Sequence, residues 1–442
     1  MKFLHTSDWH LGRALYGRKR YEEFELFLNW LLETIEKQKI DALLVAGDIF
    51  DTSTPSNRAQ QLYYRFLINV AKSHCQHVVV IAGNHDSPSF LGAPKELLNA
   101  LNVYVVSEMT ESPEDEVIEL KNSHNETEAI ICAVPYLRDK DLRTVTAGES
   151  IEDKMTKLID GLKQHYNSVC EVAEQKQNAL MKREQTAYVP IVGMGHLFTS
   201  GGKTLDGDGV RDLYVGTLAH IGKDDFPSSI DYLALGHLHI AQKVGSEEHI
   251  RYCGSPIPMG FGEASQDKKV VLIEFNERVN ERVDVNESDE FNQQTQHSPT
   301  QHSPNQKSIV EELLIPCFQV LSRITGTVDE IVDEVNILKI DAPKCWLEIE
   351  YTGKDVVNNL SEIINELIEN TEIEVRRIKN KRVIDKVLSS SDFGETLDDL
   401  NENEVFERCL ETFEVSEQDK PELIHTYREI IQSINENDTQ AE

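Results

Sequence analysis

Apolar and polar positions follow two rhythms along residues 1–276. Short apolar runs rich in β-branched residues, such as Ala42–Ala46 and Val78–Ala82, predict buried strands. Between them, as in Tyr21–Lys37, apolar residues recur every three or four positions and predict amphipathic helices. This alternation indicates an α/β domain of layered sheets and helices. We expect strands at 3–6, 42–46, 78–82, 103–106, 130–134, 189–194, 232–235 and 270–275, and helices at 21–37, 58–71, 91–101 and 151–184, with Gly161 as a candidate break.

The stretch 286–308 interrupts this pattern. Gln, Asn, Ser, His and Pro dominate it, and Thr-Gln-His-Ser-Pro occurs twice, at Thr295–Pro299 and Thr300–Pro304. A segment with so little apolar surface cannot form a core, so we expect a polar, low-complexity linker here.

A smaller folded unit is predicted after the linker. Strand and helix patterns alternate there in the order βαβαβ, at 318–324, 328–338, 346–351, 356–368 and 373–378. This order predicts a small α+β cap of the ferredoxin-like type. Two further amphipathic helices are expected at 404–413 and 421–434, and their apolar stripes either pack on their own domain or dock onto a partner helix or coiled coil. The expected organisation is 1–285 for the large α/β domain, 286–308 for the linker, 309–388 for the cap and 389–442 for the C-terminal helices.

The chain is strongly acidic. Its 442 residues carry 77 Asp and Glu against 44 Lys and Arg, a net charge of −33, and about two-thirds of the excess lies after residue 276. A free-standing DNA-binding domain is usually basic, because neutralising phosphates drives its affinity. The acidity therefore reflects solubility or a salty or cold habitat, or a partner subunit supplies most of any affinity for nucleic acid.

Cysteine usage and the amino terminus indicate a cytoplasmic protein. The seven cysteines are scattered and form no C-x-x-C pair, which argues for a reducing compartment. The apolar run at the amino terminus is too short and too polar for a signal peptide. No apolar run approaches the roughly 20 residues that a membrane span needs.

Five short motifs follow five of the predicted strands and carry side chains that bind metals. They are Asp8-Trp9-His10, Gly47-Asp48-Ile49-Phe50-Asp51, Gly83-Asn84-His85-Asp86, Gly195-His196 and Gly236-His237-Leu238-His239. Each lies at the carboxyl end of a strand, so the side chains can converge on one crevice. Carboxylate, imidazole and amide-oxygen ligands suit manganese, iron or zinc rather than a thiolate zinc site or a calcium loop. Paired ions of this kind hydrolyse phosphate esters.

Taken in this order, the motifs resemble those of the calcineurin-like metallophosphoesterase superfamily. The stretches that carry the resemblance read Thr6-Ser7-Asp8-Trp9-His10-Leu11-Gly12-Arg13, Ala46-Gly47-Asp48-Ile49-Phe50-Asp51, Ala82-Gly83-Asn84-His85-Asp86-Ser87 and Tyr252-Cys253-Gly254-Ser255-Pro256-Ile257-Pro258. The resemblance implies a layered β-sandwich flanked by helices. It covers most of the chain, including the cap and tail, and departs from the family at the linker.

The resemblance also implies a role for each matched residue. The first metal would be held by Asp8, His10, Asp48 and His239, and the second by Asp48, Asn84, His196 and His237. Asp48 would bridge the two ions, because cations roughly 3.5–4 Å apart need negative charge between them. His85 would face the scissile phosphate and stabilise or protonate the leaving oxygen. Asp51 would pair with His85 and favour its protonated form.

Differences from the protein phosphatase branch favour a nuclease or another phosphodiesterase. Those phosphatases typically carry Arg-Gly after the second motif, where this chain has Thr52-Ser53, and Gly-Asn-His-Glu where this chain has Asp86. The resemblance implies two manganese ions and a DNA nuclease that acts on duplex ends and on hairpins or single strands. It also implies an ATPase partner with a coiled coil, two copies of each subunit, and self-association through the nuclease domain. The alternatives are a small-molecule phosphodiesterase and a non-catalytic scaffold for the ATPase.

Two basic segments are candidates for contacts to DNA. The first follows the first motif closely and the second ends the cap, and either could equally be a solvated surface. Tyr16 and Trp9 could stack on a base, although Trp9 could equally pack beneath the site. The basic candidates are Arg13, Arg18, Lys19 and Arg20 in the first segment, and Arg376, Arg377, Lys379, Lys381, Arg382 and Lys386 in the second.

Overall fold

The computed structural model describes residues 1–143, 150–184, 188–204, 221–275, 308–353, 357, 359–380, 406, 410, 420, 423, 424 and 427. These residues divide into two compact units. The first unit comprises Met1–Arg13, Tyr21–Met259 and Gln266–Phe318, and the second comprises Ala14–Arg20, Gly260–Ser265 and the chain from Gln319.

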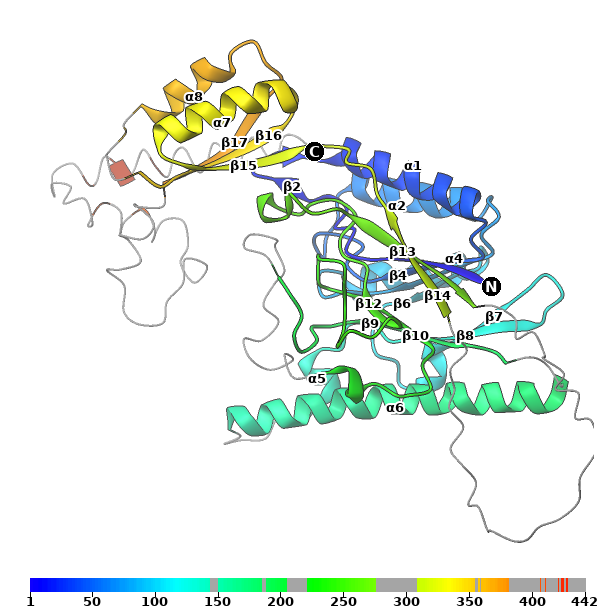
Figure 1. Ribbon diagram of the computed structural model, residues 1–442. Coiled ribbons are helices and arrows are strands. Elements are labelled where there is room, and N and C mark those ends of the chain that lie inside the picture. Colours follow the sequence, from blue (N-terminus) through cyan, green and yellow to red (C-terminus); the bar gives the residue numbers. More distant parts are fainter. Residues whose placement is uncertain are drawn as a thin grey trace, which may run out of the picture. The chain divides into compact units, whose positions relative to one another are not determined.

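Two six-stranded sheets form the first unit (Figure 1). The first has the order β14-β13-β1-β4-β5-β6, in which β1, β4, β5 and β6 are parallel and β13 is antiparallel to both its neighbours. Its strands are β1 (Lys2–Thr6), β4 (Ala42–Ala46), β5 (His77–Ile81), β6 (Val103–Val106), β13 (Lys269–Phe275) and β14 (Ser308–Leu314).

The second sheet has the order β11-β12-β10-β9-β8-β7, with β8, β9, β10 and β12 parallel. The strands at its two edges, β7 and β11, are antiparallel to their neighbours. Its strands are β7 (Val117–Lys121), β8 (Thr127–Ala133), β9 (Ile191–His196), β10 (Tyr232–Gly236), β11 (Gln242–Lys243) and β12 (Ile250–Tyr252).

Apolar side chains on both faces of each sheet explain the layers. In β4, Leu44 joins the cluster between the sheets, together with Val192 and Met194 of the second sheet. Leu43 points to the opposite face, where it packs under helices α1 (Tyr21–Gln38) and α2 (Asn57–Val70). Helix α6 (Ile151–Glu184) covers the outer face of the second sheet in the same way (Figure 1). The predicted α/β sandwich flanked by helices is confirmed.

Two predicted helices differ from the structure. Residues 91–101 form no single helix, because α3 (Pro88–Gly92) and α4 (Lys95–Asn99) are separated at Pro94. Helix α6 continues through Gly161, where a Cβ would lie 2.4 Å from the carbonyl oxygen of Leu142. This glycine therefore permits close packing against α5 (Asp139–Leu142) and does not break the helix. The remaining short helices of this unit are η1 (Pro113–Glu116) and η2 (Lys223–Asp225).

The second unit contains a three-stranded sheet of order β15-β16-β17. All three strands are parallel, and α7 and α8 pack on one face of the sheet. The ferredoxin-like prediction is therefore wrong for the described residues, since β15 and β16 are direct neighbours with no strand between them. The elements are β15 (Leu321–Gly326), α7 (Val328–Asp341), β16 (Trp346–Tyr351), α8 (Leu360–Ile368) and β17 (Glu374–Asn380), with the hairpin β2 (Ala14–Leu15) and β3 (Arg18–Lys19) and the short helix η3 (Phe261–Glu263).

The boundary of the cap also differs from the prediction. Residues 309–314 were expected in the cap, but they belong to β14, which pairs along its length with β13 of the first unit. The cap therefore begins at Gln319. The linker lies outside the described residues except for Ser308, at the start of β14.

Six residues of the C-terminal segment are described, and all six are helical. The rings of Phe406 and Tyr427 stack with centroids 4.0 Å apart, and Leu410 is buried. The two predicted helices thus contact each other through residues of their apolar stripes. Among the described residues, no helix is both long enough and apolar enough to cross a membrane.

Candidate metal centre

The five motifs meet at one place in the first unit. Three follow strands of the first sheet, β1, β4 and β5, and two lie at the ends of β9 and β10 in the second sheet. The sequence predicted convergence at the strand ends, and the structure adds that two sheets contribute. Ring nitrogens and carboxylate oxygens from these motifs form three groups, each with atoms within 4.8 Å of one another: Asp8, His10 and His239; His10, Asp51 and His85; and Asp48, His196 and His237.

The backbone is left-handed at four of the predicted ligands. The φ angles are +52° at Asp8, +47° at His10, +50° at Asp48 and +102° at His237. Non-glycine residues rarely adopt this region, and each such residue costs of order 1–3 kcal/mol. The side chains of these four residues nevertheless converge in the groups described above, so this backbone conformation accompanies the assembly of the cluster.

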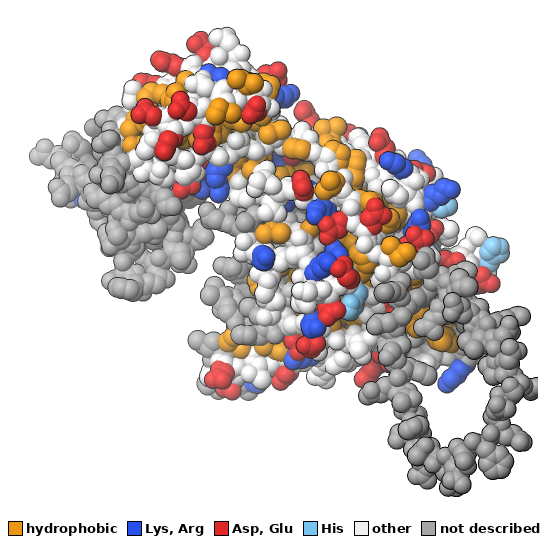
Figure 2. All heavy atoms as spheres, viewed as in Figure 1, with side chains coloured by type: hydrophobic (Ala, Val, Ile, Leu, Met, Phe, Trp, Pro, Cys, Tyr) orange, Lys and Arg blue, Asp and Glu red, His pale blue; other side chains and the backbone are white. Residues whose placement is uncertain are grey.

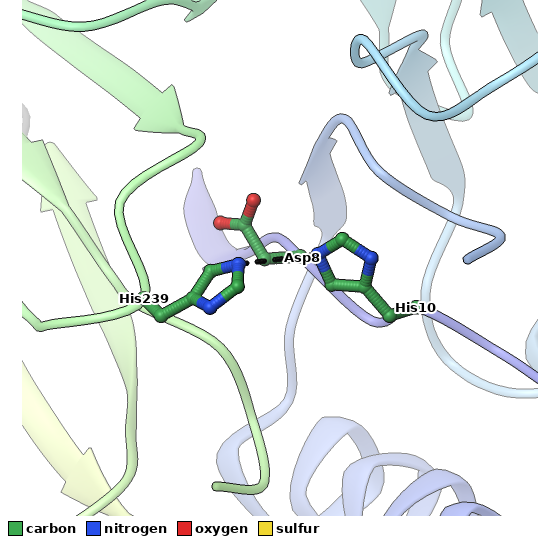
Figure 3. Close-up of side chains that lie close together, drawn as sticks. All are labelled: Asp8, His10 and His239. Atoms are coloured by element: carbon green, nitrogen blue, oxygen red, sulfur yellow. Dashed lines mark hydrogen bonds between the residues drawn. The ribbon is translucent and has the colours of Figure 1, made fainter. Parts of the chain in front are cut away.

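The first group joins the loop after β1 to the loop after β10. In Figure 3, Asp8 and His10 face His239, and the Nε2 atoms of the two histidines are 3.2 Å apart. The Ser7 hydroxyl donates to the Asp8 carboxylate, and the backbone N–H of His237 donates to Asp8 Oδ1 at 2.9 Å. Asp8 is therefore held by both sheets.

Asn84 lies against the third group, which contains Asp48, His196 and His237. Its Oδ1 lies 3.0 Å from Nε2 of His196 and 3.1 Å from Nδ1 of His237. Oδ2 of Asp48 lies 3.4 Å from Nε2 of His196 and 3.6 Å from Nε2 of His10. Asp48 thus stands between the two groups, which is where a bridging carboxylate is needed.

Hydrogen bonds outside the cluster orient the rings. The Nδ1–H of His196 donates to the carbonyl of Ala46 at 2.9 Å, which leaves Nε2 facing Asp48. The Nδ1–H of His85 donates to the carbonyl of Asp51 at 2.8 Å. Such contacts select the tautomer and fix the ring plane of a metal-binding or catalytic histidine.

The predicted pairing of Asp51 with His85 needs correction. His85 contacts the backbone carbonyl of Asp51, whereas the carboxylate faces His10 Nδ1 at 3.4 Å and Arg13 Nη1 at 3.1 Å. Burial alone would raise the pKa of Asp51, but contacts with His10 and Arg13 lower it to about 2. The carboxylate of Asp51 thus faces the Arg13 guanidinium and the His10 ring, which lie on that side of the loop.

Burial and neighbouring charges set the protonation of the cluster. Burial alone would raise the pKa of Asp48, but the nearby imidazoles, His196 first, hold it well below its ordinary range. Burial alone would lower the pKa of His196, whereas the Asp48 carboxylate raises it to about 9. Burial lowers the pKa of His10 to about 4. Asp48 is thus an ionised group balanced by adjacent positive charge, the role that a bound cation takes.

This donor set fits divalent metal ions. The Nδ1 atom of His237 faces Asn84 Oδ1 at 3.1 Å, and Nε2 of His196 faces the same oxygen at 3.0 Å. Asp48 adds a carboxylate oxygen beside them, so several lone pairs meet at a point where a divalent cation can accept them. The donors are oxygen and nitrogen atoms, which suits manganese, iron or zinc.

Comparisons with known proteins agree with this geometry. Residues 1–241 match the family described as calcineurin-like phosphoesterase, and residues 317–413 match SbcD_C, described as the type 5 capsule protein repressor C-terminal domain. The SbcD component of the nuclease SbcCD from Escherichia coli K12 is 34% identical over 433 residues, which cover 97% of each chain. The chain belongs to the SbcD family. Its counterparts in Rhodobacter capsulatus and Bacillus subtilis are 33% and 31% identical, each over 62% of this chain and 66% of the relative.

Membership of the SbcD family confirms the resemblance inferred from the motifs. The chain is accordingly a hydrolase of phosphate esters, and the calcineurin-like fold implies divalent metal ions.

Two glycines of the SbcD-family motifs are required by close approach. A Cβ at Gly83 would lie 2.1 Å from Oδ1 of Asp48, and a Cβ at Gly236 would lie 1.8 Å from the carbonyl oxygen of Ala46. Any side chain at either position would displace the loop that carries a ligand.

Sequence reasoning missed supporting residues around the metal centre. The Asp86 carboxylate accepts the N–H groups of Gly83, Ile49 and Phe50 at 2.9–3.1 Å, which joins the second motif to the third. The Lys268 ammonium is buried and donates to the carbonyl of His239 at 3.1 Å. Asp86 ends a recognised motif, which was a usable signal, whereas no local pattern marks Lys268.

The stretch Tyr252–Pro258 also supports two of the predicted metal ligands. The Ser255 N–H donates to the carbonyl of His239 at 3.2 Å, and the Ser255 hydroxyl accepts from Lys268 at 2.9 Å. Cys253 Sγ lies 3.1 Å from the Ser7 hydroxyl, which in turn contacts Asp8. The motif therefore orients one ligand from each sheet.

Of the four basic residues near the first motif, two are accessible to a ligand and two are occupied within the protein. Arg18 is exposed and Lys19 half-buried, so both remain candidates. Arg20 is 2% exposed, which rules out a role at the surface, and the Arg13 guanidinium contacts Asp51. The prediction for Arg20 is wrong because the residue at the end of the hairpin turns inward.

The two aromatic candidates are also engaged. Trp9 is fully buried, donates to the Thr6 hydroxyl at 2.9 Å and packs edge-on against Phe66, so it cannot stack on a base. The Tyr16 ring stacks on Phe261 at 5.9 Å, and the Arg377 guanidinium lies 4.8 Å from its centre.

Proposed function

We propose that the chain is a metal-dependent DNA nuclease subunit that works with an SbcC-like ATPase in processing DNA ends and hairpins. The observation that carries the proposal is the convergence of seven ligand side chains and His85 in one buried cluster. Support also comes from relatives of nearly the same length that are named as the SbcD component of the nuclease SbcCD. The proposed activities are exonuclease action on duplex ends and endonuclease action on single strands and hairpins.

The proposed ligands follow the two sides of the cluster. Two manganese ions would be held here, the first by Asp8, His10, Asp48 and His239 and the second by Asp48, Asn84, His196 and His237. When bound, the ions polarise the phosphoryl group and lower the pKa of water. Asp48 keeps the ions together, because its carboxylate lies between His10 and His196 at 3.6 and 3.4 Å.

His85 is proposed to act on the leaving oxygen. Its Nδ1–H is committed to the carbonyl of Asp51, so Nε2 is the ring nitrogen that can meet the substrate. A second contact, from the His85 N–H to Asp48 Oδ1 at 2.9 Å, holds its backbone against the bridging carboxylate. His85 therefore keeps its place relative to the metal ions while it donates a hydrogen bond or a proton.

Charge within the second unit favours a DNA-binding role for one face of its sheet. The face opposite the helices carries Arg323, Arg377 and Lys379, which surround the buried carboxylate of Glu348 at 2.6, 3.8 and 3.3 Å. Helices α7 and α8 instead expose Asp and Glu (Figure 2). Glu350 and Glu374 lie on the same face of the sheet as the three cations, and Glu374 contacts Arg18 at 3.7 Å and Arg376 at 3.1 Å. Five cations therefore meet three carboxylates here, which leaves this face basic in an acidic chain, and phosphate contacts can form there.

The ATPase is proposed to supply the rest of the DNA affinity. A net charge of −33 opposes unaided binding to a polyanion. The C-terminal helices are the proposed contact with the coiled coil of the SbcC-like ATPase. Two copies of each subunit, self-association through the nuclease domain and a cytoplasmic location complete the proposal.

The test is cleavage of end-labelled duplex and hairpin DNA by the chain together with its ATPase. We expect cleavage in manganese and none in EDTA. His85→Ala should keep both metals and lose a factor of about 10²–10⁴ in rate, as for a lost general acid. Asp48→Ala should lose metal binding and cleavage. His74→Ala, at a half-exposed histidine outside the cluster, is the matched control and should cleave normally.

Two results would contradict the proposal. Cleavage that survives in Asp48→Ala would refute the metal assignment, and an unchanged rate in His85→Ala would refute its role. Hydrolysis of a small chromogenic diester without any DNA cleavage, even with the ATPase present, would instead indicate a small-molecule phosphodiesterase.

A further inference from the structure

Arg13 lies next to the metal centre, although its sequence position suggested a contact with DNA. Its side chain is 18% exposed, and its Nη1 donates to Asp51 Oδ1 at 3.1 Å. Its Nε donates to the carbonyl of Met259 at 3.3 Å. Its backbone N–H donates to the carbonyl of His10 at 3.0 Å. The guanidinium therefore holds two acceptors from different parts of the chain.

Asp51, which accepts a hydrogen bond from Arg13, contacts both His10, a proposed metal ligand, and His85, the proposed acid. Its Oδ1 lies 3.4 Å from His10 Nδ1, and its carbonyl accepts the Nδ1–H of His85 at 2.8 Å. The rings of His10 and His85 meet edge to face, with centroids 4.7 Å apart. A shift of Asp51 would therefore reorient a metal ligand and the proposed acid together.

A carboxylate that contacts the outer nitrogen of a metal-binding histidine usually sets its tautomer and basicity. Asp51 has this relation to His10, and it is 24% exposed, so its side chain could turn toward water without a partner. Arg13 supplies that partner. An arginine can hold the carboxylate and the Met259 carbonyl at once through a fixed fork of donors, which a lysine cannot.

We propose that Arg13 is a positioning residue of the metal centre, which holds Asp51 so that His10 and His85 keep their orientation. The inference rests on the proposed metal assignment. It replaces a phosphate contact as the function of this arginine, because binding a phosphate would compete with Asp51 for the same donors.

Arg13 also fixes the points at which the chain leaves the first unit. Arg13 and Met259 are each the last residue of a segment of the first unit, and the residues that follow them, Ala14 and Gly260, belong to the second unit. The contact between Arg13 and the Met259 carbonyl joins these two exits to Asp51.

The test compares Arg13→Gln and Arg13→Lys with Arg65→Gln in the full chain. Arg65 is a matched control, because it pairs with Glu25 on the surface of α1 and α2, away from the cluster. Binding of Mn²⁺ to the metal-free protein is measured by titration calorimetry. Hydrolysis of bis(p-nitrophenyl) phosphate, which is too small to reach beyond the cluster, is measured beside DNA cleavage with the ATPase.

We expect Arg13→Gln to weaken Mn²⁺ binding at one site by about 10–100-fold, as for other residues that orient metal ligands. The loss of kcat/KM should be equal for the small diester and for DNA. Arg13→Lys should recover part of both, and Arg65→Gln should match the wild type. In an Asp51→Asn background, Arg13→Gln should add less than a further twofold loss, because its partner is already altered.

A phosphate contact predicts a different result. If Arg13→Gln binds Mn²⁺ and hydrolyses the small diester like the wild type, but shows a higher KM for DNA and a weaker dependence on salt, the inference is wrong. Loss of hydrolysis with unchanged Mn²⁺ binding also overturns it. The metal and small-diester measurements do not depend on DNA, so they separate this inference from a failure of the proposed nuclease activity. Circular dichroism of each variant identifies misfolding, and Arg13→Lys then carries the comparison.

Discussion

Replacing Asp86 should destabilise the first unit by an amount that the hydrogen bonds around it determine. Asp86 is 5% exposed, and its Oδ2 accepts the N–H groups of Gly83 at 2.9 Å and Ile49 at 3.1 Å. Its Oδ1 accepts the N–H of Phe50 at 3.0 Å. An alanine would leave three buried donors without partners.

Each orphaned donor costs about 1–3 kcal/mol. Water can enter the space that the carboxylate vacates and satisfy part of the loss. For Asp86→Ala we therefore expect the free energy of unfolding to fall by about 3–6 kcal/mol.

Asp86→Asn separates the contributions of the two oxygens. Its amide oxygen can keep both bonds made by Oδ2, but its NH₂ group then meets the N–H of Phe50. Burial, with the charge of Asp48, raises the pKa of Asp86 to about 7, so the loss of the negative charge itself should cost little. We expect a loss of about 1–3 kcal/mol, from one donor.

The assay is urea unfolding followed by tryptophan fluorescence. Replacing Trp346 by Phe leaves Trp9 and Trp30, which both belong to the first unit, so the signal reports that unit alone. Asp141→Ala is the control, because Asp141 accepts a single N–H, from Arg138 at a helix start, and should cost about 1 kcal/mol. The reasoning would be refuted if the free energy of unfolding of Asp86→Ala lay within about 1 kcal/mol of the wild-type value. It would also be refuted if Asp86→Asn lost as much stability as Asp86→Ala.

Three further predictions follow from the cluster and its support. Gly83→Ala should abolish metal binding, since its Cβ would overlap Oδ1 of Asp48 at 2.1 Å. Trp9→Ala should lower the free energy of unfolding by about 3–5 kcal/mol, because the ring is fully buried between Phe27 and Phe66. Removing metal with EDTA should lower the Tm, because at 100 times its Kd a bound ion adds about 2.7 kcal/mol to stability.

Titration calorimetry measures metal binding by Gly83→Ala, and urea unfolding measures the stability of Trp9→Ala. Differential scanning fluorimetry measures the Tm with and without EDTA. Gly222→Ala is the control for Gly83→Ala, since its φ of −102° suits alanine and the nearest atom to a Cβ there is 3.8 Å away. Normal Mn²⁺ binding in Gly83→Ala would contradict the close approach of the two loops. Normal stability in Trp9→Ala would contradict its place in the core, and a Tm indifferent to Mn²⁺ and EDTA would contradict the metal centre.

The sequence by itself determined the strands and the residues of the cluster. A strand such as β4, buried on both faces, must be apolar throughout, and Leu43 and Leu44 report this burial locally. The ligands follow directly after such strands, so chain connectivity alone brings Asp8, Asp48 and Asn84 to one end of a sheet. The order of the motifs then indicated the family, which the relatives confirmed.

The tertiary structure alone decided which elements are neighbours. Periodicity records that a side chain is buried but not what covers it, so the division of the motifs between two sheets and the parallel order of β15, β16 and β17 were not predictable. The same limit explains Trp9 and Arg20, which share local patterns with surface residues but lie in the interior.

Side-chain partners distant in sequence were decided in the same way. The Asp51 carboxylate turns to Arg13 and His10, and Lys268 reaches the carbonyl of His239, because folding brings these groups within hydrogen-bond range. The energy of such contacts depends on distances of a few ångströms, which no local pattern of residues encodes. The residues of the cluster can thus be read from the chain, whereas most of the contacts that hold them in place cannot.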